Sequence, residues 1–324
     1  MAEFDLIARI RARAGARDDV LLGIGDDAAV LRVPAGHDLV VSTDTLSIGV
    51  HFPPETAPSD IGWKALAVNL SDLAAMGATP AWCTLNLTLP DADSKWLDAF
   101  LDGFLQLAAQ HRIALVGGDT TRGPLSITVT VHGFVPHGAA LLRSGAQVGD
   151  LVCVTGTLGN AAGALRQWQR GVPIHSRLGS SLMRPTPRIE LGQFLRGLAT
   201  ACIDISDGLL ADLGHVLAAS GVGAEIEIAE LPTSAVLASK FDEAERRELQ
   251  LSGGDDYELC FTVPAGHAMD VIAATTDVDF PIRRIGRIEA QRGLRLRELD
   301  GTVHAVAARG YRHFDPSHDK TDRA

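Results

Sequence analysis

Aspartate recurs beside glycine, serine or threonine at the ends of apolar segments of this chain. The first case is Gly23-Ile24-Gly25-Asp26-Asp27, in which two glycines allow a tight turn and two carboxylates follow. The apolar run from Ala28 to Val33 then predicts a buried segment directly after the acids. The acids found in similar contexts downstream, one of them on a predicted helix, are Asp44, Asp72, Asp119, Asp204, Asp207, Asp255 and Asp256.

Each of these acids taken singly has a structural explanation, because aspartate is a favoured turn and helix-capping residue. Several of them, however, directly follow hydrophobic strands, and ligand sites of α/β proteins gather at the carboxyl ends of strands. Four or five carboxylates in one place would repel each other by several kcal/mol at an effective dielectric constant of about 20, so they need cations between them. Hard oxygen ligands without a histidine or cysteine cluster point to several Mg²⁺ ions, which most often hold a polyphosphate.

The common phosphate-binding motifs are missing from the sequence. There is no GxxxxGK followed by serine or threonine, and there is no HRD or DFG kinase set. A glycine turn such as Thr155 to Gly159 could bind phosphate through backbone N–H groups. The residues alone therefore indicate a Mg²⁺-dependent, nucleotide-using enzyme without a covalent intermediate, and a non-catalytic metal- or nucleotide-binding module remains the alternative.

Composition limits the class of protein and its partners. The chain has 324 residues, 46% of them hydrophobic and 5% aromatic, with 33 glycines, which is typical of an α/β protein of two domains. The net charge of −11 argues against nucleic acid or an anionic membrane as a partner. The N-terminus lacks the apolar core of a signal peptide, and no apolar run approaches the ~20 residues of a membrane span. Four widely spaced cysteines inside apolar segments are typical of the reducing cytoplasm.

The first half of the chain predicts a sheet covered by helices on one face. Residues 38–42 predict a strand ending at Thr43 and Asp44, and 59–76 predict a helix on which Asn69 and Asp72 share a face. A strand at 82–89, a helix from Ser94 to Ala108 and a strand at 113–116 follow. The spacing of Leu97, Phe100 and Phe104 predicts an apolar stripe on this helix that packs in the core. Residues 125–135 alternate between apolar and polar side chains, so the second face of this sheet is polar and suits a dimer or a wet barrel interior.

The second half predicts an α/β domain after a glycine-rich boundary. The expected division is an N-terminal domain at 1–137, a linker at 138–149, a C-terminal domain at 150–314 and a disordered tail at 315–324. Helices are expected after the Ser206-Asp207-Gly208 turn, over 188–199 and over 243–250, the last capped by Asp242. Residues 171–187 contain three prolines and are expected to be irregular. Strands are expected at 151–154, 201–205, 224–228, 259–263, 282–288 and 293–298.

Ten motifs between residues 4 and 314 together resemble the thiamine-monophosphate kinase family. They separate it from the wider superfamily of aminoimidazole ribonucleotide synthetase and selenophosphate synthetase. The motifs are Gly23–Val30, Ser42–Leu46, His51–Phe52, Lys64–Pro80, Gly117–Pro124, Arg143–Ala146, Val154–Gly159, Arg184–Arg188, Ile203–Asp212 and Leu251–Phe261.

The resemblance implies a fold, an activity and an assembly. The fold is the two-domain α/β (α+β) arrangement of aminoimidazole ribonucleotide synthetase, in which the N-terminal sheet forms a barrel across a homodimer. The activity is the ATP-dependent phosphorylation of thiamine monophosphate to thiamine diphosphate, the last step in making that cofactor, by direct Mg²⁺-assisted transfer in the cytoplasm. The alternative is another ATP-using member of the superfamily, such as a ring-closing synthetase.

The resemblance also implies roles for particular residues. On sequence alone, Arg143 is equally well a solvated linker arginine, whereas His51 is more typical of a loop histidine and Tyr311 of a packed aromatic. Side chains alternate along an extended strand, so only one of the first acidic pair should face the metals, and the family match selects Asp27. The implied Mg²⁺ ligands are Asp27, Thr43, Asp44, Asp72, Asp119, Asp204 and Asp207; the implied ATP contacts are Gly118, Asp119, Arg143 and Ser206; the implied substrate contacts are His51, Asp255 and Tyr311.

Two chemical points follow from the family match. The acceptor is a phosphate monoester whose second pKa is about 6, so it is mostly ionised at pH 7 and no catalytic base is expected. Positioning and electrostatic stabilisation by Mg²⁺ and arginine can carry the reaction. The family commonly has glutamate where Asp255 stands, so the carboxylate of this chain is one methylene shorter.

Overall fold

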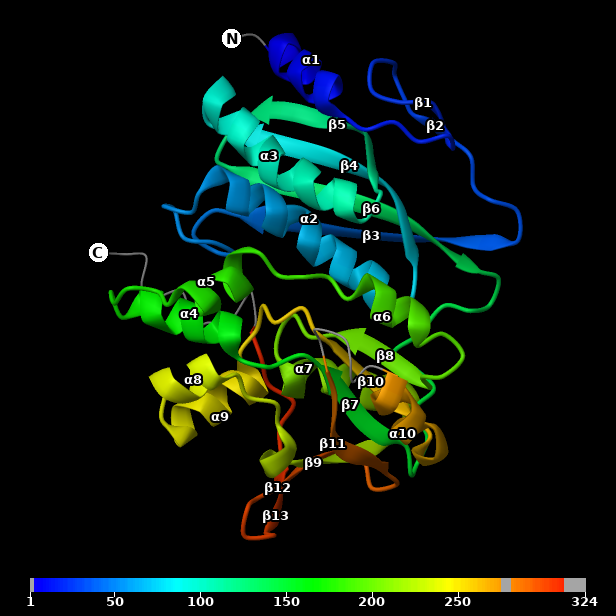
Figure 1. Cartoon of the computed structure of the whole chain (residues 1–324), viewed down its shortest axis with the longest axis vertical. Coiled ribbons are helices and arrows are strands. Elements are labelled where there is room, and N and C mark those ends of the chain that lie inside the picture. The colour runs from blue at the N-terminus through cyan, green and yellow to red at the C-terminus, as the bar shows by residue number, and fades with distance from the viewer. Residues whose placement is uncertain (1–2, 275–280, 312–324) are drawn as a thin grey trace. The chain divides into compact units, whose positions relative to one another are not determined.

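A computed structural model of the chain describes residues 3–274 and 281–311 (Figure 1). The chain forms two compact units. The first comprises Met1–Leu142 and Met183–Leu198, and the second comprises Arg143–Leu182 and Ala199–Ala324. Each unit combines helices with a β-sheet, as the predicted fold class requires. The expected disordered tail lies outside the described residues.

A four-stranded sheet in the order β3-β6-β4-β5 forms the centre of the first unit, and β1 and β2 form a separate two-stranded sheet. The elements of this unit are α1 (Glu3–Arg13), β1 (Val20–Leu22), β2 (Val30–Leu31), β3 (His37–Ser47), α2 (Pro58–Ala75), β4 (Thr79–Leu89), α3 (Ser94–Gln110), β5 (Ala114–Arg122), β6 (Ser126–Pro136) and α6 (Ile189–Phe194).

Helices α2 and α3 lie side by side over one face of this sheet (Figure 1). They approach so closely that a Cβ on Gly62 would lie 2.0 Å from the Phe100 carbonyl oxygen, and one on Gly103 would lie 1.8 Å from that of Ser59. Glycine is therefore required at both positions of the helix crossing. The side chains of α3 that face the core were predicted from their spacing, and Leu97, Phe100 and Phe104 are fully buried.

The two faces of the sheet differ as predicted. On β6 the side chains of Ile127, Val129 and Val131 are buried, whereas Ser126, Thr128 and Thr130 are half-buried on the opposite face. Leu39 and Val41 of β3 share that opposite face and are 45% and 53% exposed. We call this side the open face of the sheet. Its apolar side chains on an edge strand leave a surface that is suited to burial against another sheet.

The segment Met183–Leu198 belongs to the first unit, although the sequence analysis assigned it to the C-terminal domain. The Arg184 guanidinium pairs with Asp60 at 2.5 Å, and the indole of Trp63 donates to the Pro185 carbonyl at 2.9 Å. These contacts join residues more than 120 positions apart, so the local composition of the segment could not reveal them. The helix expected over 188–199 is confined to α6, Ile189–Phe194.

The second unit is built on a seven-stranded sheet in the order β13-β12-β9-β11-β7-β10-β8, which is antiparallel except between β9 and β12. Its buried core includes Val152, Ile203, Leu213 and Ile226. The elements are β7 (Leu151–Thr155), α4 (Asn160–Gln169), α5 (Ser176–Met183), β8 (Ala201–Asp204), α7 (Leu209–Ser220), β9 (Gly223–Glu227), the 3₁₀ helix η1 (Ile228–Glu230), α8 (Ala235–Lys240), α9 (Glu243–Ser252), β10 (Leu259–Val263), α10 (Ala265–Ala274), β11 (Ile282–Glu289), β12 (Gly293–Arg297) and β13 (Val303–Val306).

Most predicted elements of this unit are confirmed, and one prediction is wrong. Asp242 caps α9, where its carboxylate accepts the N–H of Glu245. Residues 171–187 were expected to be irregular, but Ser176–Met183 forms α5, which lies between Pro173 and Pro185 and therefore contains no proline. All four cysteines are free and buried, as predicted.

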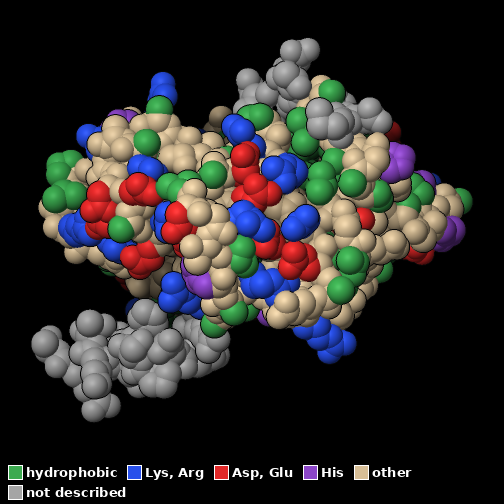
Figure 2. Space-filling model, turned by 90° about the horizontal axis from the view of Figure 1, so that it is seen from below, with side chains coloured by type: hydrophobic (Ala, Val, Ile, Leu, Met, Phe, Trp, Pro, Cys, Tyr) green, Lys and Arg blue, Asp and Glu red, His purple; other side chains and the backbone are tan. Residues whose placement is uncertain are grey.

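The strands β9, β11 and β12 carry a ladder of ion pairs. Arg284 pairs with Glu227 at 2.7 Å, and Arg297 pairs with Glu225 at the same distance. Figure 2 shows basic and acidic side chains interspersed on the face that it views. Glu225 is buried, whereas Arg284 and Glu227 are both partly exposed, and a pair with that exposure contributes little stability. Within residues 3–274 and 281–311, none of the helices combines the length and hydropathy of a membrane span.

Candidate active site

The acidic pair at the N-terminal turn does not have the conformation predicted for it. Residues Gly23 to Ala29 form turns and bends, with Gly25 at φ +123°, and the Asp27 N–H donates to the Asp26 carboxylate at 2.8 Å. Both acids are exposed, so the argument from an alternating strand does not apply to them. The apolar run that follows is also not buried, because β2 has only two residues and Val30 and Val33 are 47% and 43% exposed.

Asp44 and Asp72 are brought together in the first unit. Asp44 lies within β3, which continues to Ser47 because it pairs with β6 along its full length. Asn69 of α2 accepts the Asp44 N–H at 3.0 Å, and Asp72, one turn further along, accepts the Ser42 hydroxyl at 2.5 Å. The predicted shared face of Asn69 and Asp72 therefore points at the edge of β3.

The two carboxylates influence each other's protonation. Asp44 is exposed at the surface, but partial desolvation by the surrounding groups and the neighbouring Asp72 raise its pKa to about 6, well above the ordinary value of 3.8. Two like charges this close favour protonation of one of them unless a cation lies between. A divalent cation that accepts oxygen ligands would remove this repulsion, so the chemistry of the pair fits Mg²⁺.

Thr43 and Asp119 lie on the opposite side of the sheet from Asp44. The register pairs Thr45, Thr128, Asn86 and Asp119 in one row across the four strands, and this row belongs to the open face. The Thr43 hydroxyl donates to the Val129 carbonyl and accepts from Thr130. Strands β3 and β5 are the two edges of the sheet, three strand spacings or about 14 Å apart. Within one sheet, Asp119 and Asp44 therefore lie on opposite faces and on opposite edge strands, so they do not meet.

Only glycine fits at the position of Gly118, the neighbour of Asp119. Its φ is +145°, and a Cβ there would lie 1.9 Å from the Leu85 carbonyl oxygen. The glycine lets β5 approach β4 closely while its backbone stays exposed on the edge strand. An exposed glycine backbone beside an aspartate is suited to contact a phosphate.

His51 lies on the turn that follows β3. Its Nδ1 accepts the Ser47 N–H at 3.0 Å, which puts the ring hydrogen of the neutral imidazole on Nε2. Lys64 of α2 is fully buried, and its ammonium donates to the His51 carbonyl at 3.0 Å. The helix therefore fixes the turn that carries the predicted substrate contact.

In the second unit, the predicted residues converge on one loop. β8 ends at Asp204, which is 4% exposed, and Ser206, Asp207 and Gly208 lead into α7. The Asp255 N–H donates to the Ser206 carbonyl at 2.8 Å, and the Tyr311 N–H donates to the Asp207 carbonyl at 3.0 Å. Candidate metal, nucleotide and substrate residues thus meet within one unit.

Asp212 holds this loop and was not singled out from the sequence. One oxygen of its carboxylate accepts the N–H groups of Ser206, Asp207 and Gly208 at 3.0, 3.1 and 3.0 Å. Burial and the neighbouring Asp207 raise the pKa of Asp212 to about 7, against the lowering effect of the three N–H groups. The sequence feature that could have indicated this role is an acid in the first turn of a helix whose N-cap residue, Gly208, has no side chain.

Arg143 is not brought to this loop. Its carbonyl accepts the hydroxyl of Ser220, the last residue of α7, and its side chain is exposed. The loop adjoins the first residue of the same helix, which is about 17 Å long. Among the described residues, no group of three or more histidine, cysteine or acidic side chains is arranged to hold a metal ion.

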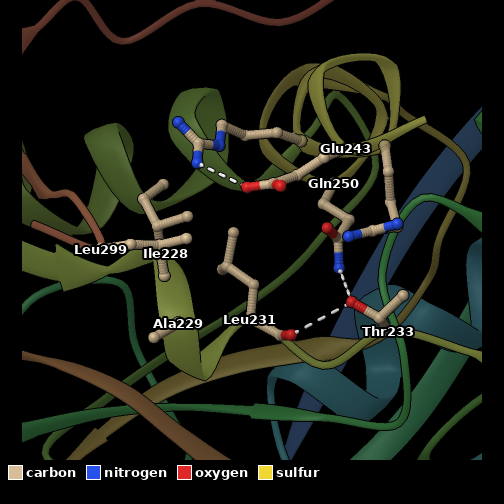
Figure 3. A pocket seen from close by; sticks show the side chains of 9 residues that line it. Ile228, Ala229, Leu231, Thr233, Glu243, Gln250 and Leu299 are labelled. Atoms are coloured by element: carbon tan, nitrogen blue, oxygen red, sulfur yellow. Dashed lines mark hydrogen bonds and ion pairs between the residues drawn. The ribbon is translucent and has the colours of Figure 1, made fainter. Parts of the chain in front are cut away.

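A pocket of about 280 Å³ lies elsewhere in the second unit and contains none of the predicted site residues (Figure 3). It is lined by α9, η1 and the segment that follows, with Leu299 at one side. Glu243 is paired with Arg247, and Gln250 donates to Thr233 and to the Pro232 carbonyl. The Gln250 bonds fasten α9 to the 231–233 segment, and the Glu243–Arg247 pair lies within α9, which favours a packing role.

Comparison with protein-family models assigns both parts of the chain. Residues 25–135 match the model described as AIR synthase related protein, N-terminal domain. Residues 147–298 match AIR synthase related protein, C-terminal domain. The two matches leave only residues 136–146 between them.

Similar proteins extend over nearly the whole chain. The thiamine-monophosphate kinase of Salmonella typhimurium is 47% identical over 319 residues, covering 96% of this chain and 98% of the relative. The solved structure of thiamine-monophosphate kinase from Stenotrophomonas maltophilia is 55% identical with a TM-score of 0.86, covering 93% of this chain and 97% of that one. A structure of AaThiL complexed with AMPPCP and TMP is 31% identical with a TM-score of 0.77, covering 96% of each chain.

Proposed function

The chain belongs to the thiamine-monophosphate kinase family, and we infer that it catalyses the ATP-dependent phosphorylation of thiamine monophosphate to thiamine diphosphate. The observation that carries this inference is the convergence of Asp204, Ser206, Asp207, Asp255 and Tyr311 on one loop of the second unit. The relative solved with AMPPCP, a non-hydrolysable ATP analogue, and TMP supports the choice of both substrates.

The reaction is a direct transfer of one phosphoryl group. An oxygen of the thiamine monophosphate phosphate forms a bond to the γ-phosphorus of ATP, and the bond from that phosphorus to the β–γ bridging oxygen breaks to release ADP. The attacking phosphate is mostly ionised at pH 7, so no side chain has to remove a proton. The protein's task is to hold two polyanions together in line, which it accomplishes by positioning and charge.

We propose that Mg²⁺ is bound by Asp27, Asp44, Asp72, Asp119, Asp204 and Asp207, with Thr43 as a further ligand. The all-oxygen donor set and the mutual repulsion of Asp44 and Asp72 support this assignment. When bound, Mg²⁺ neutralises charge on the phosphates. The chain's own contribution is the orientation of each ligand, exemplified by the Ser42 hydroxyl on Asp72.

The nucleotide and the substrate are assigned to different side chains. Gly118, Asp119, Arg143 and Ser206 are proposed to contact ATP, and the exposed backbone at Gly118, where no side chain intervenes, supports this role. His51, Asp255 and Tyr311 are proposed to bind thiamine monophosphate. The Tyr311 side chain is 42% exposed beside the Asp207 loop, and an exposed aromatic ring at this position suits contact with a heterocycle.

We further propose that the active protein is a homodimer in which the open faces of two first-unit sheets form a barrel. Two features support it: β3 is an eleven-residue edge strand, and its open face exposes Leu39 and Val41. Closure of a barrel removes such edges. The four free cysteines support a reducing, cytoplasmic location.

Purified protein incubated with Mg²⁺, ATP and thiamine monophosphate tests the activity, with thiamine diphosphate and ADP as the expected products in equal amounts. Thiamine without its phosphate is the matched control acceptor and should give no thiamine diphosphate. Sedimentation of the same sample tests the dimer, for which twice the mass of one 34.2 kDa chain is expected.

A further inference from the structure

The segment Asp255 to Glu258 carries three acids and one tyrosine, and the structure gives each side chain a different partner. The Asp256 carboxylate accepts the N–H of Gly159 at 2.9 Å and is half-buried at the start of α4. The Glu258 carboxylate accepts the Thr155 hydroxyl at 2.5 Å. The Tyr257 hydroxyl donates to the Asp255 carboxylate at 2.9 Å. Asp255 and Glu258 thus each accept a hydroxyl, and the donor to Asp255 lies within the same segment, two positions away.

The backbone of this segment is strained where the tyrosine and aspartate lie. Asp255 has φ +68° and Tyr257 has φ +49°, values that side-chain-bearing residues rarely adopt. Such conformations persist only where the surrounding structure enforces them, and they concentrate at functional sites. Here the strain turns the side chains of residues 255 and 257 toward each other, two positions apart.

Backbone hydrogen bonds enforce this conformation. The N–H groups of Asp255 and Tyr257 donate to the carbonyls of Ser206 and Ile205, each at 2.8 Å, and the Ile205 N–H donates to the Glu258 carbonyl at 2.8 Å. The Tyr257 ring is itself buried, with 9% of its surface exposed. Its hydroxyl is therefore a fixed donor, held by the same loop that carries Ser206.

We propose that Tyr257 is a positioning residue that orients the Asp255 carboxylate toward the cationic heterocycle of thiamine monophosphate. The inference rests on the proposed function, because Asp255 is a substrate contact only in that scheme. The hydroxyl occupies a lone pair on Oδ1, which limits rotation of the carboxylate and so fixes the direction in which it faces a ligand. The donor is neutral, so the carboxylate keeps its full charge for a positively charged substrate.

The test is Tyr257→Phe, which removes one oxygen and keeps the buried ring. We expect KM for thiamine monophosphate to rise about 10-fold, as for loss of a hydrogen bond to a charged group, with kcat and KM for ATP unchanged within about twofold. Ser239→Ala is the control, because it deletes a hydroxyl that donates only within α8 and is exposed. It should leave all three constants unchanged.

A double-mutant cycle separates positioning from a general structural effect. In an Asp255→Ala background, which lacks the carboxylate, adding Tyr257→Phe should not raise KM further. An unchanged KM in Tyr257→Phe, a further rise in the Asp255→Ala background, or a parallel loss of kcat and both KM values would each overturn the inference. Thiamine diphosphate formation by the unaltered protein is scored separately, so failure of the proposed function is distinguishable from failure of this proposal.

Discussion

Replacement of Asp212 tests whether its carboxylate holds the loop that carries Ser206 and Asp207. One carboxylate oxygen accepts three backbone N–H groups in a position where the side chain is only 3% exposed. Asp212→Ala leaves those three donors without their acceptor, at about 1–1.5 kcal/mol each, so at pH 5 we expect a loss of about 3–5 kcal/mol in the free energy of unfolding. Asp212→Asn presents an oxygen that can accept all three, so the expected loss at pH 5 is below about 1 kcal/mol.

The same variants have a predicted pH dependence in metal-free solution. The pKa of Asp212 is raised from 3.8 to about 7, so its stabilising contribution is complete below pH 4 and is lost as pH rises through 7. Linkage sets the size of the loss at about 1.4 kcal/mol per pKa unit, or about 4 kcal/mol in all, and the asparagine variant should lack it. Urea denaturation in EDTA at pH 5 and pH 8 measures both effects, and because this window covers about two of the three pKa units, the expected pH-dependent loss within it is about 3 kcal/mol. An alanine variant that loses less than about 1 kcal/mol at pH 5 would refute the role assigned to Asp212.

Three further predictions concern the metal site and the second unit. Asp119→Asn and Asp204→Asn should each lower kcat by at least about 100-fold with unchanged circular dichroism, because each removes a charged metal ligand. Unaltered turnover in both variants would contradict the proposed metal set. Mg²⁺ with ATP should raise the melting temperature by more than the sum of the shifts that each causes alone, because the ions and the nucleotide bind each other as well as the protein. Additive shifts in calorimetry would count against a shared site. Asp256→Ala should lower the free energy of unfolding by about 1–2 kcal/mol, because the N-cap residue of α4, Gly159, has no side chain to replace the lost acceptor. A loss below about 0.5 kcal/mol in urea denaturation would be inconsistent with a capping role for Asp256.

Hydrophobic periodicity predicted the helices and strands that pack most tightly. The stripe on α3 and the alternation on β6 are buried as expected, because each depends only on local spacing and on one large neighbouring surface. Short elements with little local signal were missed, including α5, α8 and β13. The attachment of Met183–Leu198 to the first unit was also missed, since it depends on contacts to Asp60 and Trp63 far away in sequence.

The candidate site was predictable as a set of residue types but not as a set of neighbours. The i, i+3 spacing of Asn69 and Asp72 correctly gave a shared face, and β3 turned out to lie against it. Strand register, which single-sequence reasoning does not supply, separates Asp119 and Thr43 from Asp44 across the sheet. Asp212 and Tyr257 were passed over because their importance comes from hydrogen-bond partners rather than from a motif.

The most direct test of the central claim is phosphate transfer itself. ATP labelled at its γ-phosphate is incubated with Mg²⁺, thiamine monophosphate and the purified chain, and the products are separated and counted. Transfer of the label to thiamine diphosphate, with one ADP formed for each, is the result that the proposed function predicts. ATP consumption that releases the label as inorganic phosphate, without labelled thiamine diphosphate, would contradict it and favour the ring-closing synthetase alternative.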